Sequence, residues 1–275
     1  MESLGLPEAL LTNWLSRRSG LILVTGPTGS GKTTTLYAAL NALNNSERKI
    51  ITVEDPVEYR LPGLNQVQVH DKIDLDFARV LRAALRQDPD VILVGEMRDQ
   101  ATAEIGLRAA LTGHLVLSTL HTNDAMSTPA RLIDMGVPRY MVAMSLQMVL
   151  AQRLVRVICP HCAEVHRPDA HELAWLETQC GRTVDAAPLR RGAGCNECSH
   201  TGFSGRTGVY EILEMTRELV EAMNHGDPLT FAQAARRQMA GHHLGQDAAR
   251  LVLAGRTTVA EAMRVSHQMA EGPAG

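Results

Sequence analysis

The first half of the chain alternates short apolar runs with segments in which apolar residues recur every three or four positions. The apolar runs are rich in Val, Ile and Leu and predict strands, whereas the segments with the longer period predict amphipathic helices. The predicted strands lie at residues 20–26, 49–54, 90–95 and 113–119, and the predicted helices at residues 32–44, 75–86 and 100–111. Continuous apolar strands separated by helices are typical of a parallel sheet covered on both faces, so we expect an α/β fold.

The pattern changes after about residue 150. Residues 159–208 contain all five Cys of the chain and many Gly and His, with little regular periodicity. Helical patterning then returns in four segments. These segments lie at residues 217–224, 230–239, 246–254 and 258–267. We therefore expect three regions: a core in residues 1–150, a cysteine-bearing segment in residues 151–210 and a small helical subdomain in residues 211–275.

Composition narrows the class of protein. Hydrophobic residues make up 45% of the 275 residues and charged residues 21%, which suits a chain with a buried core. The net charge of -3 and the 3% of aromatic residues argue against a nucleic-acid partner. No signal peptide is visible, and the apolar stretch at residues 141–150 is too short and too polar to be a transmembrane segment. We expect a soluble cytoplasmic protein, in which pairs of Cys indicate metal binding or catalysis before disulfides.

The segment after the first predicted strand matches the pattern G-x-x-x-x-G-K-[ST] of the P-loop. Backbone N–H groups of such a loop cradle phosphates, while Lys32 reaches the β- and γ-phosphates of ATP and Thr33 binds Mg²⁺. A glycine-rich turn without a ligand is the alternative, but the order of strand, loop and helix favours a P-loop. The expected nucleotide-binding residues are Gly26, Pro27, Thr28, Gly29, Ser30, Gly31, Lys32, Thr33 and Thr34.

Acidic residues and a histidine follow the other predicted strands. Glu96 comes after the third strand, where open α/β sheets bind their ligands, and can organise Mg²⁺, although an isolated Glu there would be taken as solvated. Glu54, Asp55 and Glu58 follow the second strand, and one of them can act as general base on a water, although a solvated turn has the same composition. His121 ends the fourth strand and can contact the γ-phosphate, yet a lone His is more often an ordinary surface or core residue.

Four segments in order resemble the Walker A, Asp box, Walker B and His box of the secretion-superfamily ATPases. They read GPTGSGKTTTLYA, ITVEDPVEY, LRQDPDVILVGEMRD and LTGHLVLSTLHTNDA, and the resemblance to the GspE/PilB-type motors runs from about residue 18 to about residue 265. It implies a RecA-like P-loop NTPase with a mostly parallel sheet and with Gly95 where P-loop proteins usually carry Asp.

The same resemblance implies roles for single residues. Glu58 matches the general base and Lys32 the P-loop lysine of that family. Glu96 matches the residue that organises Mg²⁺, and His121 the residue that reads the γ-phosphate. Arginines of such motors stabilise transition-state charge, sometimes across a subunit boundary. The candidates here are Arg60, Arg82, Arg86 and Arg98.

Two C-x-x-C pairs form the second informative pattern: Cys159 with Cys162, and Cys195 with Cys198, with 32 residues between the pairs. Together they can close a tetrahedral Cys₄ zinc site, which has no open position and is therefore structural. The spacing exceeds that of a simple zinc ribbon, so we expect a helix near residues 170–178 to fill it. A thioredoxin-like redox pair would explain one C-x-x-C but not two. The flanking sequences resemble the zinc-bearing segment of GspE/PilB-type motors, which pilus-retraction motors generally lack.

The resemblance implies an ATP-hydrolysing motor that powers assembly of pilin-like subunits for type II secretion or type IV pilus extension. It also implies a homo-hexamer in the full-length family and an inner-membrane platform protein as partner, so that the motor lies peripherally on the cytoplasmic face of that membrane. Two other functions stay open: a nucleic-acid-associated RecA-like motor, and a non-hydrolysing nucleotide-binding regulatory module.

The position of the P-loop gives a further expectation. Full-length members of the resembled family have an N-terminal half that forms part of the nucleotide cleft. Here the P-loop begins at residue 26 of 275, which leaves no room for that half. We therefore expect the motor and zinc portion alone, as a fragment, a truncated gene or a reduced homologue. We expect such a chain to bind nucleotide weakly and to be largely monomeric.

Overall fold

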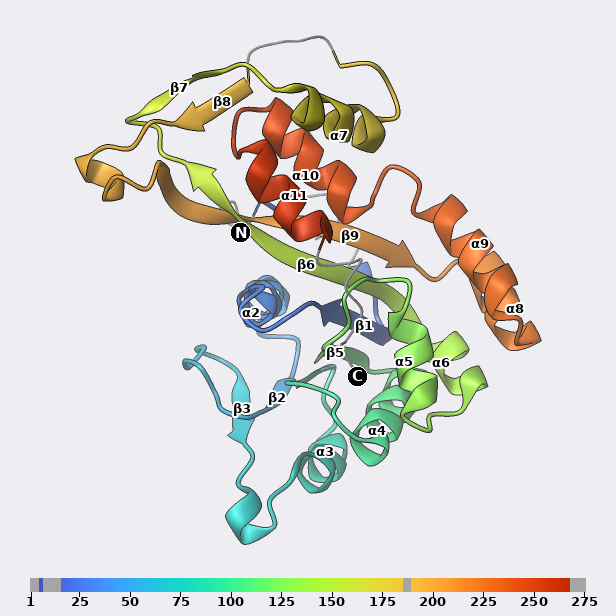
Figure 1. Cartoon of the computed structure of the whole chain (residues 1–275). Helices are drawn as coiled ribbons and strands as arrows, with labels where there is room; N and C mark the ends of the chain where they lie inside the picture. Colours follow the sequence, from blue (N-terminus) through green and yellow to red (C-terminus); the bar gives the residue numbers. More distant parts are fainter. Residues whose placement is uncertain (1–4, 7–15, 185–188, 268–275) are drawn as a thin grey trace. The chain divides into compact units, whose positions relative to one another are not determined.

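The computed structural model describes residues 5–6, 16–184 and 189–267 (Figure 1). Its main sheet has seven strands. In spatial order they are β3 (Asn65–Gln68), β2 (Ile50–Glu54), β4 (Val91–Val94), β5 (Leu115–Leu120), β1 (Gly20–Thr25), β6 (Leu146–Ile158) and β9 (Phe203–Glu214). Every neighbouring pair from β3 to β6 in this order is parallel. The carboxyl ends of β2, β4, β5 and β1 therefore meet at one edge of the sheet.

The described residues form two compact units. The sheet unit comprises those within Leu6–Ala151 and Ile212–Met239, and the cysteine unit those within Met1–Gly5, Gln152–Glu211 and Ala240–Gly275. Helices from residues 211–275, which we expected to form one subdomain, contribute to both units. The helices α8 (Arg217–His225) and α9 (Pro228–Gln238) belong to the sheet unit, and α10 (Leu244–Leu253) and α11 (Val259–His267) to the cysteine unit.

Helices cover both faces of the sheet unit. They are α2 (Lys32–Leu43), α3 (Phe77–Leu85), α4 (Gln100–Leu111), α5 (Thr128–Asp134) and α6 (Arg139–Ser145). Both α2 and α4 pack against β1 and β5, and Figure 1 shows them on opposite sides of β1. Leu21 and Leu23, alternate residues of β1, pack with Leu107 of α4 in one buried cluster. The predicted parallel α/β sheet, covered on both faces, is confirmed.

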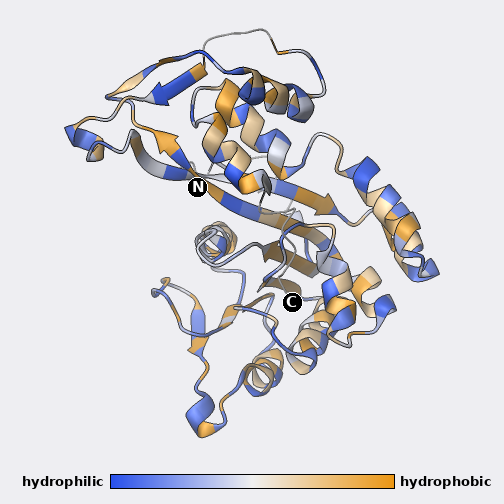
Figure 2. Ribbon diagram, in the orientation of Figure 1, coloured by the Kyte–Doolittle hydropathy of each residue, from blue (hydrophilic) through white to orange (hydrophobic). Residues whose placement is uncertain are grey.

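Local sequence explains where these helices begin. The side chain of Asp76 accepts a hydrogen bond from the backbone N–H of Arg79 and caps α3, and Asp99 does the same for Thr102 and α4. Figure 2 shows the central strands in the orange of apolar residues, which agrees with the fully buried pattern of β1, β4 and β5. Such strands, buried on both faces, are what the continuous apolar runs predicted.

Two long strands, β6 and β9, were not predicted. In the sequence, residues 141–150 form one apolar stretch. In the structure this stretch is divided, because α6 ends at Ser145 and β6 begins at Leu146. Periodicity fails here because β6 carries polar residues that are nonetheless buried: Gln152 is 0% and Arg153 2% exposed. Tertiary packing, rather than alternation of residue type, makes this segment a strand.

The cysteine unit has its own core. The helix α7 (Ala170–Cys180) lies in the region where a helical insert was expected, and it begins with a capping box made by Asp169 and Glu172. It packs with α10 and α11 around Leu176 and Val252. A short antiparallel pair, β7 (Ala163–His166) and β8 (Leu189–Gly192), flanks the cysteine-rich loops.

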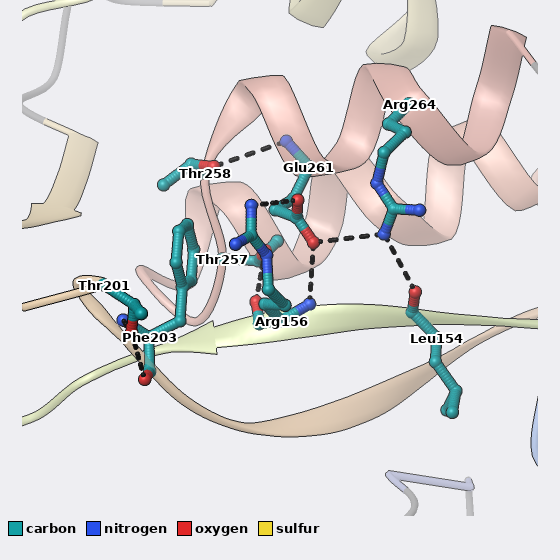
Figure 3. Close-up of polar contacts among 8 residues, drawn as sticks. All are labelled: Leu154, Arg156, Thr201, Phe203, Thr257, Thr258, Glu261 and Arg264. Atoms are coloured by element: carbon teal, nitrogen blue, oxygen red, sulfur yellow. Dashed lines mark hydrogen bonds and ion pairs between the residues drawn. The ribbon is translucent and has the colours of Figure 1, made fainter. Parts of the chain in front are cut away.

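A buried carboxylate attaches α11 to β6. Glu261 accepts hydrogen bonds from the backbone N–H of Arg156 at 2.9 Å, from the guanidinium of Arg156 at 2.8 Å and from that of Arg264 at 3.2 Å (Figure 3). The Arg156 guanidinium also lies 4.1 Å from the ring centre of Phe203. Although burial acts against the charged form, these hydrogen bonds lower the pKa of Glu261.

Within the described ranges, no helix combines the length and apolar character that crossing a membrane requires.

Candidate functional site

The predicted P-loop lies between β1 and α2, at the carboxyl edge of the sheet. Gly29 and Gly31 have φ values of +77° and +89°, a region that residues with a Cβ rarely adopt, so glycine allows the chain to turn tightly here. Gly31 is the N-cap of α2, and the N-terminus of a helix carries partial positive charge. The loop therefore brings a helix N-terminus to the sheet edge, an arrangement that binds anions.

Side chains of the loop add to this anion site. Lys32 is half-buried, and its Nζ donates to two carbonyl oxygens of the loop at 2.8 and 3.1 Å. Thr33 and Thr34 are exposed in the first turn of α2. Ser30 is 4% exposed, and its hydroxyl has no hydrogen-bond partner in the described part of the chain. One ammonium group, two exposed hydroxyls and one unsatisfied hydroxyl fit a phosphate chain with Mg²⁺.

The ends of β2, β4 and β5 bring the other predicted residues to the same edge. The segment after β4 is held to the end of β5, because Met97 N–H donates to Thr119 O at 3.1 Å and the Thr119 hydroxyl donates to Gly95 O at 2.7 Å. Gly95 lies close to β2: a Cβ there would be 3.2 Å from Val53 O and 3.3 Å from Glu54 Cα. This close approach gives a physical reason for glycine at the position where P-loop proteins usually carry Asp.

Glu96 is the centre of a cluster of charged groups. Its side chain is 13% exposed; one carboxylate oxygen pairs with the guanidinium of Arg98, and the other lies 3.6 Å from Nε2 of His121. Arg98 also lies 3.7 Å from a carboxylate oxygen of Asp55. The hydrogen bond to Glu96 raises the pKa of Arg98, so this arginine stays charged. The structure thus brings together residues from three of the predicted motifs.

Glu58 and the other arginine candidates lie apart from this cluster. Glu58 is exposed, and across the described ranges its side chain makes no hydrogen bond or ion pair. Arg60 is exposed and donates to the backbone oxygen of Gln66 at 2.9 Å. Arg82 and Arg86, in and just after α3, are exposed with no side-chain partner among the described residues. Of the four arginine candidates, Arg98 is the one that contacts Glu96.

Sequence reasoning missed a polar network beside this edge. Glu54 is 4% exposed and accepts hydrogen bonds from the hydroxyls of Tyr37 and Thr52 and from the side-chain amide of Gln66. The signal was present: Tyr37 stands on the apolar face of α2, where a buried phenol needs a hydrogen-bond partner. A structural role of Thr25 was missed as well. Its hydroxyl donates to Leu120 O at 3.0 Å and joins β1 to the end of β5.

The four predicted cysteines converge in the cysteine unit. All four Sγ atoms lie within 4.8 Å of one another. Three of the Sγ–Sγ distances are 3.9 Å (Cys159–Cys195), 3.8 Å (Cys162–Cys198) and 3.8 Å (Cys195–Cys198). A tetrahedron with Zn–S bonds of about 2.3 Å has S–S edges of about 3.8 Å. The thiol set therefore has the dimensions of a zinc site, and all four cysteines are free of disulfides.

Backbone N–H groups surround the sulfurs. Gly194 N–H donates to Cys162 Sγ, and the N–H groups of Cys195 and Gly202 donate to Cys198 Sγ, each at 3.3 Å. The N–H of Cys195 lowers the pKa of Cys198 to about 6, whereas burial raises the pKa of Cys162 to about 12. Without a cation Cys162 therefore keeps its proton at neutral pH, and a metal ion bound among the sulfurs would be needed to hold all four as thiolates.

Comparison with known proteins gives consistent matches. The family model for type II/IV secretion system proteins matches residues 3–264. Type II secretion system protein E of Pseudomonas aeruginosa is 48% identical over 273 residues, which is 98% of this chain and 53% of that protein. Type IV pilus assembly ATPase PilB of Myxococcus xanthus is 44% identical over 261 residues, which is 93% of this chain and 45% of that protein.

A solved structure agrees with the sequence matches. The crystal structure of the pilus retraction motor PilT with bound ADP superposes with a TM-score of 0.71 at 33% identity, covering 96% of this chain and 66% of that one. The chain spans about half the length of the curated relatives it matches. These matches confirm the resemblance that the four sequence motifs carry. The chain belongs to the type II/IV secretion system protein family.

Proposed function

We propose that the sheet unit binds ATP with Mg²⁺ and hydrolyses it. The observation that carries this proposal is the convergence of the P-loop, Glu96 and His121 at one edge of the parallel sheet. A lysine, a helix N-terminus and a carboxylate with a histidine are the groups that phosphoryl transfer to water needs, because its catalysis rests on positioning and on charge stabilisation.

Each residue has a distinct part in this proposal. Lys32 and the N–H groups at the start of α2 hold the phosphates, while Thr33 and Glu96 would hold Mg²⁺, which when bound supplies positive charge beside the transferred phosphoryl group. Glu58 accepts a proton from the attacking water, and His121 contacts the γ-phosphate. The exposure of Glu58 leaves its carboxylate accessible to a water.

The arginines divide into two groups. Arg98 acts within the chain as the ion-pair partner of Glu96, because it already contacts that carboxylate. Arg60, Arg82 and Arg86 remain candidates for stabilising transition-state charge, and their exposure suits a role across a subunit boundary.

We also propose that the four cysteines hold a structural Zn²⁺ ion. The Sγ–Sγ distances near 3.8 Å and the N–H donors at 3.3 Å support a closed, tetrahedral site without an open position. The metal would tie the loop after β6 to the loop before β9.

For the whole protein, we propose a motor that powers assembly of pilin-like subunits in type II secretion or type IV pilus extension. Support comes from relatives described as type II secretion system protein E and as the type IV pilus assembly ATPase PilB. A homo-hexamer, an inner-membrane platform protein as partner and a peripheral place on the cytoplasmic face of that membrane complete the proposal.

Steady-state ATP hydrolysis tests the enzymatic part. We expect Mg²⁺-dependent turnover by the chain and a loss of about 100-fold or more in Lys32→Ala and Glu96→Gln, because each removes charge stabilisation from the transition state. A matched control is Arg182→Ala, which lies in the cysteine unit and should leave turnover unchanged. Equal turnover in the wild type and both site variants would contradict the proposal.

A further inference from the structure

Glu54 is a buried carboxylate for which the proposed reaction has no step. It ends β2 four residues before Glu58, yet it is 4% exposed while Glu58 is exposed. Both of its oxygens are occupied: Oε2 accepts from the Tyr37 hydroxyl, and Oε1 accepts from the Thr52 hydroxyl and from Nε2 of Gln66 at 3.3 Å. A carboxylate held by three donors and shielded from water is poorly placed to take a proton from an attacking water.

Two of the three partners of Glu54 come from other elements, which the site must keep in register. Tyr37 is completely buried in the second turn of α2, five residues after Lys32. Gln66 is 9% exposed in β3, which pairs in parallel with β2. Because a helix is rigid over so short a distance, fixing Tyr37 also fixes the beginning of α2 and the P-loop lysine.

The same network holds the loop that follows β2. Leu61 N–H donates to Oε1 of Gln66 at 2.7 Å, and Nε2 of Gln66 donates to Tyr59 O at 3.1 Å. The rings of Tyr37 and Tyr59 meet edge to face, with centroids 4.7 Å apart. The loop from Asp55 to Leu64 contains no helix or strand. These side-chain contacts therefore hold it in place, as backbone hydrogen bonds hold the helices and strands.

We propose that Glu54, with Tyr37 and Gln66, is a positioning group that sets the place of the carboxylate-bearing loop relative to the P-loop helix. Glu54 acts through Tyr37 and Gln66 and touches no substrate. The inference rests on the proposed hydrolysis in one respect only, namely that Glu58, carried by this loop, accepts the proton. It assigns the two glutamates of one short segment to separate tasks, with Glu54 anchoring the loop and Glu58 facing the solvent.

Two variants remove the contacts without placing a new charge in the core. Tyr37→Phe deletes one hydroxyl and keeps the ring packed on Tyr59. Gln66→Met keeps the side-chain length and removes the amide. Tyr140→Phe, on the exposed face of α6, is the matched control for loss of a phenol, and Thr52→Ser keeps the hydroxyl donor to Glu54.

The first measurement is amide hydrogen exchange, which does not depend on hydrolysis. Tyr37→Phe leaves both partners of the hydrogen bond from Leu61 N–H to Gln66 in place. Because the loop loses its anchor through Glu54, we still expect the amides of residues 57–61 to exchange at least about five-fold faster. Exchange in β4 and β5 should stay at wild-type rates, as should the whole profile of Tyr140→Phe and Thr52→Ser. Unchanged exchange of residues 57–61 in both Tyr37→Phe and Gln66→Met would overturn the inference, and so would a uniform rise across the sheet.

The second measurement is the split between kcat and KM for Mg-ATP. We expect kcat to fall about ten-fold in Tyr37→Phe with KM within two-fold, because the loop moves while the phosphate site stays intact. A raised KM with unchanged kcat would overturn the positioning role. If the wild-type chain hydrolyses no ATP, the proposed hydrolysis fails, while hydrogen exchange still decides whether this network anchors the loop.

Discussion

The sheet edge that carries the P-loop, Glu96 and His121 is called the nucleotide edge below. It differs from the cluster of four cysteines in how completely the chain itself builds the site. In the cysteine cluster, all four donor atoms lie within 4.8 Å of one another and backbone N–H groups already face the sulfurs. At the nucleotide edge, Glu58 and Thr33 are exposed and the side chain of His121 is 54% exposed. A closed site is set by short loops of one chain, whereas an open site leaves part of its coordination to the ligand.

This difference has an energetic consequence. A structural metal site contributes directly to folding, because the ligands are dispersed in the unfolded chain. A nucleotide site that stays open stabilises the fold only through bound ligand, by an amount that grows with the logarithm of free nucleotide concentration over Kd. The two regions should therefore respond differently to loss of one side chain: the cysteine unit through stability, and the nucleotide edge through binding and turnover.

The largest effect, on zinc content and thermal stability, is expected from breaking the cysteine cluster. Cys162→Ser should lose bound zinc and lower Tm by about 10 °C, because one ligand in four is replaced by a poor one and the remaining thiols crowd without a cation. Zinc content by elemental analysis and a thermal melt measure this. Cys180→Ser, in α7 outside the cluster, is the control and should keep its zinc. Equal zinc content in Cys162→Ser and the wild type would show that the four sulfurs are not the metal site.

A smaller effect is expected from the carboxylate that holds α11. Glu261→Gln should reduce the free energy of unfolding by about 2 kcal/mol at pH 7, since Arg156 and Arg264 lose a charged acceptor that is almost completely buried. The control is Glu221→Gln in α8, whose pair with Arg217 is exposed and should be worth less than about 0.5 kcal/mol.

The pH dependence gives the sign of this contribution. The pKa of Glu261 lies below its ordinary value of 4.5, so its stabilisation is present above about pH 4.5 and is lost as the pH falls through the lower, folded-state pKa. The difference between wild type and Glu261→Gln, measured by urea unfolding, should shrink steadily as the pH is lowered from 5. A difference that stays constant over that range would contradict the assignment.

The smallest effect is expected from the arginine that pairs with Glu96. Arg98→Ala removes the cation that pairs with Glu96, so Glu96 should bind Mg²⁺ more readily and the half-saturating Mg²⁺ concentration for nucleotide binding should fall by about three-fold. Titration of Mg²⁺ at fixed ADP measures it. Arg82→Ala, whose side chain has no partner in the described ranges, should leave the Mg²⁺ requirement unchanged. A higher Mg²⁺ requirement in Arg98→Ala would mean that Arg98 assists Mg²⁺ binding rather than competing with it.

Much of the fold and of both sites could be predicted from the sequence, for identifiable physical reasons. Strands buried on both faces, such as β1 and β5, appear as continuous apolar runs, and Asp99 marks the start of α4 as an N-cap. The placement of Glu96 and His121 at one edge follows from parallel strands, whose carboxyl ends coincide. The spacing of the cysteines pointed to a cluster because two C-x-x-C pairs are rarely explained otherwise.

The remainder depends on contacts between distant residues. The strand β6 could not be read from its pattern, because burial of Arg153 is decided by the surrounding structure rather than by its neighbours in sequence. The contrast between Glu54 and Glu58 could not be predicted either. Both are glutamates in the same segment, and only the positions of Tyr37 and Gln66 decide which is buried.

The most direct test of the central claim is calorimetric titration of the chain with Mg-ADP, because binding is required before any motor function. We predict one saturable site on the wild-type chain, with Lys32→Ala binding at least about 100-fold more weakly because the ammonium group at the P-loop is lost. The control Cys180→Ser, in the cysteine unit, should bind like the wild type. Equal affinity in Lys32→Ala and the wild type, or no binding by the wild type up to about 5 mM nucleotide, would contradict the assignment of the nucleotide site to this edge of the sheet.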